Sequence, residues 1–256
     1  MPTVGAMNDT LHHRTAVVTG AAKGIGAGIA TALAAAGAPV VVNYRTDDTA
    51  AERVVRNITE AGGRAVAVRA DVTRRGEVSA LFAAAREAFG PVRVLVNNAG
   101  VYTFAPFTDV TEEDYRRQVD TNLWGTLLTM QAMAAQNDID DGAIINLSTA
   151  GTVGHPPYSA MYVATKSAVN SVTLIAAKEL APRGIRVNAI APSPSDTDGT
   201  RAMGFVGSPQ ADATVAGIPL GRLGTPEDYG PVAVFLASPA ARWITGDVLL
   251  VSGGQR

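Results

Sequence analysis

The sequence contains no cysteine, which excludes disulfide bonds and thiolate chemistry. Histidine is almost as scarce. Only His12, His13 and His155 occur, and a His-His pair in a polar stretch is typical of solvated chain, so we predict no metal site. No apolar run approaches the roughly 20 residues that a membrane helix needs, and residues 1–13 lack the apolar core of a signal peptide. We therefore expect a cytoplasmic protein that does not enter a membrane.

Charged residues are also few, at 17% of the sequence, whereas hydrophobic residues make up 47%. This balance is typical of a well-buried globular core and argues against disorder. The formal net charge is only −2, so no basic surplus indicates a nucleic-acid partner.

Short apolar runs rich in valine and isoleucine alternate with longer segments of helical periodicity. Buried strands between helices are typical of a parallel sheet covered on both faces. The expected strands are 15–19, 39–44, 65–70, 92–97, 143–147, 185–191 and 248–251. The expected helices are 25–36, 49–61, 77–89, 112–134, 160–180 and 226–237. We predict an α/β protein with a doubly wound, Rossmann-type sheet of about seven strands.

The chain shows no repeat, linker or break in composition, which favours a single domain over residues 14–256 after a flexible tail over residues 1–13. The segment 193–218 fits neither the strand nor the helix pattern. It is rich in glycine, serine, aspartate and threonine but carries Met203, Phe205 and Val206. We interpret it as a mobile lid, with an ordinary surface loop as the alternative.

The stretch TGAAKGIG, residues 19–26, lies between the first expected strand and the first expected helix. Ligands of doubly wound sheets bind at this edge. Gly20 permits a sharp turn, and Gly24 and Gly26 leave room where a phosphate approaches and where the helix packs on the strand. The helix N-terminus offers free N–H groups to an anion. The loop therefore predicts a phosphate-binding turn, with a purely structural turn as the alternative.

Tyr162 and Lys166 are four residues apart within an expected helix, so both side chains lie on one face, one turn apart. A free tyrosine has a pKa of about 10, and a neighbouring ammonium group lowers it. Such a pair is suited to transfer a proton to a carbonyl oxygen. The alternative is a pair of solvated residues on a helix surface.

Further motifs follow in order along the chain. They are Asp71-Val72, Asn97-Asn98-Ala99-Gly100, Asn122 in VDTNLWG, Ser148-Thr149, YVATK at 162–166, IRVNAIAPSPSDT at 185–197, GRLGTPED at 221–228 and VSGG at 251–254. Together they resemble the short-chain dehydrogenase/reductase family, including its 3-oxoacyl-[acyl-carrier-protein] reductase and glucose dehydrogenase-like members. The resemblance extends from about residue 14 to residue 254.

This resemblance implies hydride transfer between a nicotinamide cofactor and a ketone or secondary alcohol. It makes Tyr162 the general acid/base, with Lys166 also bonded to the nicotinamide ribose and Asn122 in a water-linked proton relay. A buried asparagine at a helix irregularity is a compatible interpretation of Asn122. The residues expected to bind the cofactor are Gly20, Lys23, Gly24, Ile25, Gly26, Tyr44, Arg45, Asp71, Val72, Asn98, Ala99, Gly100, Tyr162, Lys166, Pro192 and Thr197.

The family also places a serine hydroxyl a dozen or so residues before the tyrosine, where it polarises the substrate. Here Ser148 and Thr149 both qualify, and period-two alternation points neighbouring strand residues to opposite faces. We prefer Ser148 and keep Thr149 as the alternative. Ser193 replaces the glycine that the family usually has after Pro192, and its side chain is expected to narrow the space beside the nicotinamide.

NAD-selective enzymes usually place an acid at the end of the second strand. In VVVNYRTDD that place is held by Tyr44 and is followed by Arg45, which can pair with a 2′-phosphate, and Lys23 adds a second positive charge. We therefore expect NADP(H) to be preferred. NAD(H) remains possible, because some relatives with an Asn-Tyr-Arg turn accept both.

The expected substrate is a small, partly apolar carbonyl or alcohol. By position, its contacts would be Val101, Tyr102, Phe104, His155, Pro156, Tyr158, Met203 and Phe205. A carrier-linked 3-oxoacyl reductase is disfavoured because the acidic segment 137–141 would repel an acidic carrier. A non-redox enzyme or a regulatory nucleotide-binding protein of the same fold is a further alternative. Most relatives are tetramers that pair two long helices, here 112–134 and 160–180, so a homotetramer is expected.

Overall fold

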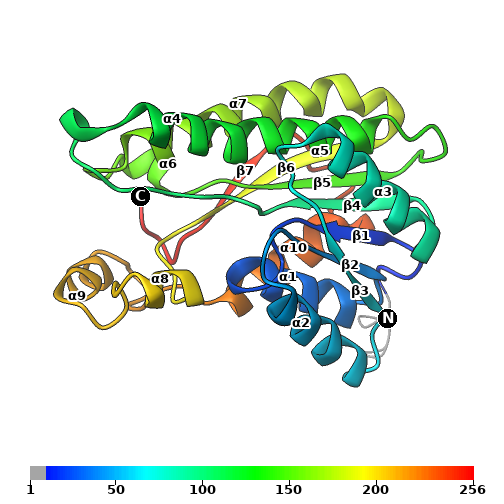
Figure 1. Cartoon of the computed structure of the whole chain (residues 1–256), viewed down its shortest axis with the longest axis horizontal. Coiled ribbons are helices and arrows are strands. Elements are labelled where there is room, and N and C mark those ends of the chain that lie inside the picture. Colours follow the sequence, from blue (N-terminus) through cyan, green and yellow to red (C-terminus); the bar gives the residue numbers. More distant parts are fainter. Residues whose placement is uncertain (1–9) are drawn as a thin grey trace.

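The computed structural model describes residues 10–256, which form one α/β unit with a seven-stranded sheet in the order β3-β2-β1-β4-β5-β6-β7 (Figure 1). Every neighbouring pair of strands is parallel. The strands are β1 (Thr15–Val18), β2 (Val40–Tyr44), β3 (Ala65–Arg69), β4 (Val92–Asn97), β5 (Gly142–Leu147), β6 (Ile185–Pro192) and β7 (Val248–Val251). The predicted doubly wound sheet is confirmed, and each strand matches its expected range to within about one residue.

Helices cover both faces of the sheet, with α1, α2 and α10 in one layer and α3, α4, α5 and α7 in the other (Figure 1). The helices are α1 (Gly24–Ala35), α2 (Asp48–Glu60), α3 (Arg75–Phe89), α4 (Glu112–Gln118), α5 (Gly125–Ala134), α6 (Gly151–Gly154), α7 (Ala160–Leu180), α8 (Asp198–Ala202), α9 (Pro209–Ala216) and α10 (Pro226–Ala237). Short 3₁₀ turns lie at Phe107–Asp109, Ala181–Arg183 and Pro239–Ala241.

Alternation along the strands divides the apolar core between the two layers. Ala16 and Val18 of β1 pack with α1 and α10, whereas Val17 between them packs on the opposite face. In β5, Ile144 and Ile145 divide in the same way. This is the side-chain geometry of a strand buried on both faces, and it explains why these strands are continuously apolar.

The chain reverses its direction of winding between β1 and β4, which are neighbours at the centre of the sheet. In open α/β sheets the loops at the carboxyl ends on either side of this switch form the ligand crevice. The loops after β1, β4, β5 and β6 therefore meet at one edge. The segments that lead into the strands lie at the other edge.

The helix expected over residues 112–134 is interrupted. Between α4 and α5 the chain makes a π-helical turn, η3 (Val119–Trp124), which contains the buried Asn122. π-Turns within helices are frequent at functional sites. The extra residue in this turn changes the direction of the side chains that follow it, which a plain 3.6-residue period does not predict.

The predicted tail requires correction where it can be compared with the structure. Residues 1–9 lie outside the described part of the chain. Leu11, expected in the tail, is completely buried in the core, and its N–H donates to the Ala36 carbonyl at 3.0 Å. The ordered domain therefore includes at least residues 10–13, because burial of Leu11 removes a large apolar side chain from water.

The predicted lid over 193–218 contains two short helices, α8 and α9. Its first residues are firmly anchored, since Ser195 is buried and its hydroxyl lies 2.5 Å from that of Tyr229 in α10. Burial raises the pKa of Tyr229, an effect that the hydroxyl of the buried Ser193 opposes, and the expected narrowing beside the nicotinamide stays a prediction. Within residues 10–256, no helix is long and apolar enough to cross a membrane.

Candidate active site

The glycine loop after β1 fits closely against the loop after β4. Gly20 has a φ of +61°, and a Cβ atom there would lie 2.9 Å from the Cα of Ala99. A Cβ atom on Gly26 would lie 2.3 Å from the Nδ2 of Asn98 and 2.8 Å from the Gly20 carbonyl oxygen. Only glycine fits at either position. The backbone of this loop is therefore held at the switch point with its N–H groups beside the start of α1.

Asn98 and Thr19 join these two loops. The Asn98 Nδ2 donates to the carbonyl oxygens of Thr19 at 2.9 Å and Gly20 at 3.0 Å. In return, the Thr19 hydroxyl accepts hydrogen bonds from the backbone N–H groups of Asn98 and Ala99, each at 3.0 Å. The predicted site residues Asn98 and Ala99 thus lie next to the glycine loop, and Asn98 supports its shape.

Asn43 is a further part of this support that sequence reasoning missed. It is buried in β2, where its Oδ1 accepts the Gly20 N–H at 3.2 Å and its Nδ2 donates to the Ala70 carbonyl at 3.1 Å. The signal was present in the sequence, because an amide within the apolar run VVVNY must find partners once it is buried. Asn43 therefore ties the glycine loop to the ends of β2 and β3.

The positive charges expected near the adenosine end are exposed. Arg45 follows β2 directly, and Lys23 lies in the glycine loop. Burial acts to raise the pKa of Asp71, but hydrogen bonds from Thr73 and the charges of Arg45 and Arg74 hold that pKa below its usual value. Asp71 and Arg45 therefore lie close enough to interact, at the ends of neighbouring strands.

Tyr162 and Lys166 lie one turn apart on α7, as the spacing predicted. The ammonium nitrogen of Lys166 is buried, donates to the Leu147 carbonyl at 2.7 Å and lies 5.9 Å from the centre of the Tyr162 ring. Burial lowers the pKa of Lys166 to about 8. The Leu147 carbonyl at the end of β5 therefore fixes the position of the Lys166 ammonium group near the Tyr162 ring.

The expected lowering of the Tyr162 pKa does not occur in this structure. Burial raises the pKa of Tyr162 to about 12, Tyr102 adds a smaller effect in the same direction, and a hydrogen bond from Thr149 opposes both. Lys166 does not offset the burial, since its ammonium group is directed at the Leu147 carbonyl. Tyr162 is accordingly a neutral phenol near pH 7, and its raised pKa makes it a weaker acid than a group whose pKa lies near the operating pH.

Thr149, rather than Ser148, lies beside the Tyr162 hydroxyl. The Thr149 hydroxyl bonds to Tyr162 and accepts the Gly151 N–H at 3.2 Å. The Ser148 hydroxyl is buried and has no hydrogen-bond partner among the described residues. The structure thus brings Thr149 near Tyr162, since the chain turns into α6 just after Thr149, and which of the two hydroxyls orients the substrate stays a prediction.

Asn122 clamps the segment that follows the Asn97–Gly100 motif. Its Oδ1 accepts the Val101 N–H at 2.8 Å, and its Nδ2 donates to the Val101 carbonyl at 2.8 Å and to the Thr165 hydroxyl at 3.0 Å. A Cβ atom on Gly100 would lie 3.3 Å from the Asn122 Oδ1 and 3.5 Å from the Lys166 ammonium nitrogen. The structure thus brings Gly100, Asn122 and Lys166 together, and the water-linked relay stays a prediction.

Helix α8 follows β6, and its first residues contact the glycine loop after β1. Thr197 caps α8 through a reciprocal bond with Thr200, and its Cβ lies 3.6 Å from the position of a Cβ atom on Gly24. The Asp198 carboxylate accepts the Gly24 N–H at 3.3 Å. Pro192, the last residue of β6, accepts the Ala150 N–H at 2.8 Å. Thr197 and Pro192 therefore lie where the loops after β1, β5 and β6 converge.

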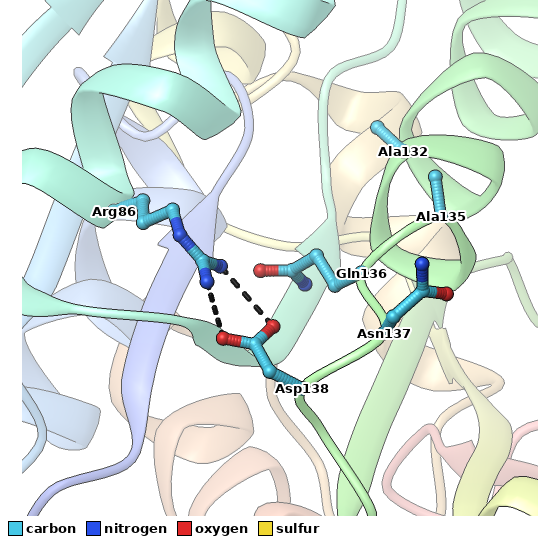
Figure 2. A pocket seen from close by; sticks show the side chains of 6 residues that line it. All are labelled: Arg86, Ala132, Ala135, Gln136, Asn137 and Asp138. Atoms are coloured by element: carbon cyan, nitrogen blue, oxygen red, sulfur yellow. Dashed lines mark hydrogen bonds and ion pairs between the residues drawn. The ribbon is translucent and has the colours of Figure 1, made fainter.

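The acidic segment before β5 lies at the opposite edge of the sheet. Asp138 pairs with Arg86 of α3, which also borders an open hollow of about 420 Å³ (Figure 2). Asp140 pairs with Arg93, and Asp141 pairs with Arg14. The hollow is lined by Arg86, Ala132, Ala135, Gln136, Asn137 and Asp138.

These ion pairs correct the argument drawn from residues 137–141. The three aspartates are matched by three arginines, so the segment does not present uncompensated negative charge. It also precedes β5, whereas Tyr162 and Thr149 lie beyond the carboxyl end of that strand. Its charge therefore gives no reason to disfavour a carrier-linked substrate.

The residues brought together fit a nicotinamide dinucleotide. Glycine at positions 20 and 26 lets the loop pack against Ala99 and Asn98, and the start of α1 supplies N–H groups for phosphate. Lys23 and Arg45 supply positive charge at the adenosine end. Among residues 10–256, no group of three or more histidine, aspartate or glutamate side chains is arranged to hold a metal ion.

This combination of a doubly wound sheet, a glycine loop and a Tyr-Lys pair defines a dinucleotide-binding oxidoreductase. A family model described as enoyl-(acyl carrier protein) reductase matches residues 20–256. The chain belongs to the short-chain dehydrogenase/reductase family, and its relatives support an oxidoreductase that acts on small molecules.

Several relatives align over almost the whole chain. An uncharacterised oxidoreductase of Methylorubrum extorquens is 50% identical, with 96% of this chain and 99% of the relative covered. The 3β-hydroxysteroid dehydrogenase 1 of Eggerthella lenta is 43% identical, with 97% and 96% covered. A short-chain dehydrogenase structure from Burkholderia cenocepacia in complex with NADP is 32% identical, with a TM-score of 0.89 and 96% and 99% covered.

Proposed function

We propose that the protein is an NADP(H)-dependent oxidoreductase that interconverts a ketone and a secondary alcohol, with Tyr162 as the general acid/base. The observation that carries the proposal is the arrangement of the Tyr162 phenol, which bonds to Thr149 and lies one turn from the buried Lys166. This arrangement lies at the same edge of the sheet as the glycine loop. A proton donor and a dinucleotide cradle are thus adjacent.

A nicotinamide cofactor, which the glycine loop, Lys23 and Arg45 would hold, would supply hydride chemistry in the direction of reduction. Tyr162 is protonated at neutral pH and donates its proton to the carbonyl oxygen as negative charge develops there. The Thr149 hydroxyl lies beside Tyr162 and orients the same oxygen by a second hydrogen bond. Lys166 and Asn122 keep the floor of the site in place.

The functional test is a titration with NADPH and NADH, followed by cofactor oxidation on a panel of aliphatic ketones, cyclic ketones and a 3-oxoacyl thioester. We expect tighter binding of NADPH and turnover of at least one ketone. Binding without turnover of any carbonyl would overturn the reductase proposal and favour a regulatory or non-redox role. Turnover restricted to the thioester would assign the carrier-linked reaction instead.

The preference for NADP(H) rests on Arg45 and Lys23, and NADP occurs in the Burkholderia structure described above. In Arg45→Asp, the lost pairing with the 2′-phosphate and the added negative charge weaken NADPH binding by about 10- to 100-fold, as expected for a charge-assisted contact. NADH affinity stays the same or improves. Fluorescence titration measures both dissociation constants.

The matched control is Arg242→Asp, which makes the same change of charge at an exposed residue before β7. It should leave both affinities unaltered. An equal loss of NADPH and NADH binding in Arg45→Asp would show that Arg45 does not recognise the 2′-phosphate.

The choice between the two neighbouring hydroxyls gives a second prediction. Thr149→Val removes the hydroxyl beside Tyr162 and lowers kcat/KM by about 10- to 100-fold, the usual effect of one lost hydrogen bond in a buried site. Ser148→Ala removes a buried hydroxyl without a partner and should leave kcat/KM unchanged. The reverse pattern in steady-state kinetics would restore Ser148 as the substrate-orienting residue.

A further inference from the structure

Two aromatic rings lie against the proposed proton donor. The Tyr102 and Phe104 ring centres are 5.9 Å and 6.1 Å from that of Tyr162, and both meet it edge to face, at 73° and 70°. Tyr102 and Phe104 are themselves 5.7 Å apart. We refer to Tyr102 and Phe104 as the ring wall. Phe104 is 50% exposed, so an apolar surface remains open beside the Tyr162 ring.

The backbone that carries the ring wall is fixed at both ends. At one end, Asn122 holds both the N–H and the carbonyl of Val101. At the other, the Ala105 N–H donates to the Tyr158 carbonyl at 2.9 Å, and Tyr158 has a φ of +66° that costs free energy in a non-glycine residue. The wall is therefore preorganised, and a ligand that packs on it does not have to order it.

The ring wall also contacts α8. A Cβ atom on Gly199 would lie 2.7 Å from the Tyr102 hydroxyl oxygen, and the next nearest atoms would be 3.8 Å and 4.0 Å away. Glycine at position 199 thus lets the Tyr102 hydroxyl approach the helix. The position of the Tyr102 ring consequently depends on α8, whose first residues also contact the glycine loop.

We propose that the ring wall selects ketones whose carbonyl belongs to a flat, fused ring system. This inference deepens the proposed function and rests on it. A carbonyl oxygen at the Tyr162 hydroxyl places the atoms next to it against Tyr102 and Phe104. A rigid ring gains aromatic contact there and loses little conformational freedom, whereas a flexible chain of equal carbon number must be ordered on binding.

The experiment compares 2-tetralone with 2-decanone, a bicyclic and a linear ketone of equal carbon number, by the kcat/KM of NADPH oxidation. Phe104→Ala should lower kcat/KM for 2-tetralone by at least about tenfold, the size of a lost aromatic contact and its buried area, and lower it by a smaller factor for 2-decanone. Phe107→Ala is the matched control, because Phe107 is 83% exposed and lies three residues further along. Phe107→Ala should leave kcat/KM unchanged for both ketones.

An equal loss of kcat/KM for both ketones in Phe104→Ala, or a wild-type preference for 2-decanone, would overturn the proposed selectivity of the ring wall. Either result would leave the reductase proposal in place. Calorimetric binding of 2-naphthol, a flat bicyclic phenol, in the presence of NADP⁺ provides a readout that needs no turnover. We expect Phe104→Ala to weaken this binding and Phe107→Ala to preserve it. If no ketone is reduced, the proposed function fails, and 2-naphthol binding that is independent of Phe104 would overturn the ring wall separately.

A double substitution tests the position of Tyr102. Gly199→Ala introduces a methyl group against the Tyr102 hydroxyl and should lower kcat/KM for 2-tetralone. Tyr102→Phe removes that hydroxyl, so the double variant should recover the kcat/KM of Tyr102→Phe alone. A loss that persists in the double variant would show that Gly199 acts through the backbone of α8 and not through the ring wall.

Discussion

Replacing Tyr162 with phenylalanine should lower kcat by about 10²–10⁴-fold, the usual contribution of a positioned general acid, while NADPH binds as tightly as before. The substitution removes the phenolic proton but keeps the ring that contacts Tyr102 and Phe104. Lys166 keeps its bond to the Leu147 carbonyl. Single-turnover oxidation of NADPH measures the chemical step, and fluorescence titration measures cofactor binding.

Tyr115→Phe is a suitable control, since Tyr115 is an exposed tyrosine on α4 that loses the same hydroxyl. Its kcat should equal that of the unaltered protein. Turnover in Tyr162→Phe comparable to wild type would mean that another group or a water molecule supplies the proton. A parallel loss of NADPH affinity would instead indicate that the substitution disturbs the floor of the cofactor site.

Gly26→Ala should weaken NADPH binding at least about tenfold and destabilise the fold by about 1–3 kcal/mol, as overpacked sites do. The added Cβ would lie 2.3 Å from the Asn98 Nδ2 and 2.8 Å from the Gly20 carbonyl oxygen. Asn98 can move only by giving up its bonds to the Thr19 and Gly20 carbonyls. NADPH titration and urea unfolding measure the two effects.

Gly76→Ala is the matched control for this substitution. Gly76 lies in the first turn of α3, and a Cβ atom there has no neighbour within 4 Å. The change should stabilise the protein by about 0.5–1 kcal/mol because alanine restricts the unfolded chain. NADPH affinity should not change. If Gly26→Ala and Gly76→Ala changed NADPH affinity and stability equally, the close packing between the loops after β1 and β4 would be contradicted.

The sheet could be predicted from the sequence because each strand is buried on both faces and therefore carries a nearly continuous apolar run. The glycine loop could be predicted because its spacing has a steric cause that is local to the chain. Asn43 shows the limit of this approach. Its partners Gly20 and Ala70 lie 23 and 27 residues away, and their positions depend on the pairing of three strands.

The orientation of the Thr149 side chain was also hard to predict, because it too depends on contacts with distant residues. Strict alternation applies within β5, but the strand ends at Leu147, and the next residues are fixed by bonds such as Ala150 N–H to the Pro192 carbonyl. The charge balance of the acidic segment before β5 likewise depends on residues that are distant in the sequence. Arg14 is 127 residues from Asp141, so the composition of the segment alone does not reveal that its charge is matched.

Asn43 also has a consequence for how this protein could change its cofactor over evolutionary time. Its amide holds the turn after β1 and the end of β3, and the next residue, Tyr44, packs its partly buried side chain against the core, whereas Arg45 is exposed. The residue that holds the turn, Asn43, and the proposed determinant of NADP(H) preference, Arg45, are thus different positions. If Arg45 selects the cofactor as proposed, substitutions at this position alter selectivity while the hydrogen bonds of Asn43 stay in place.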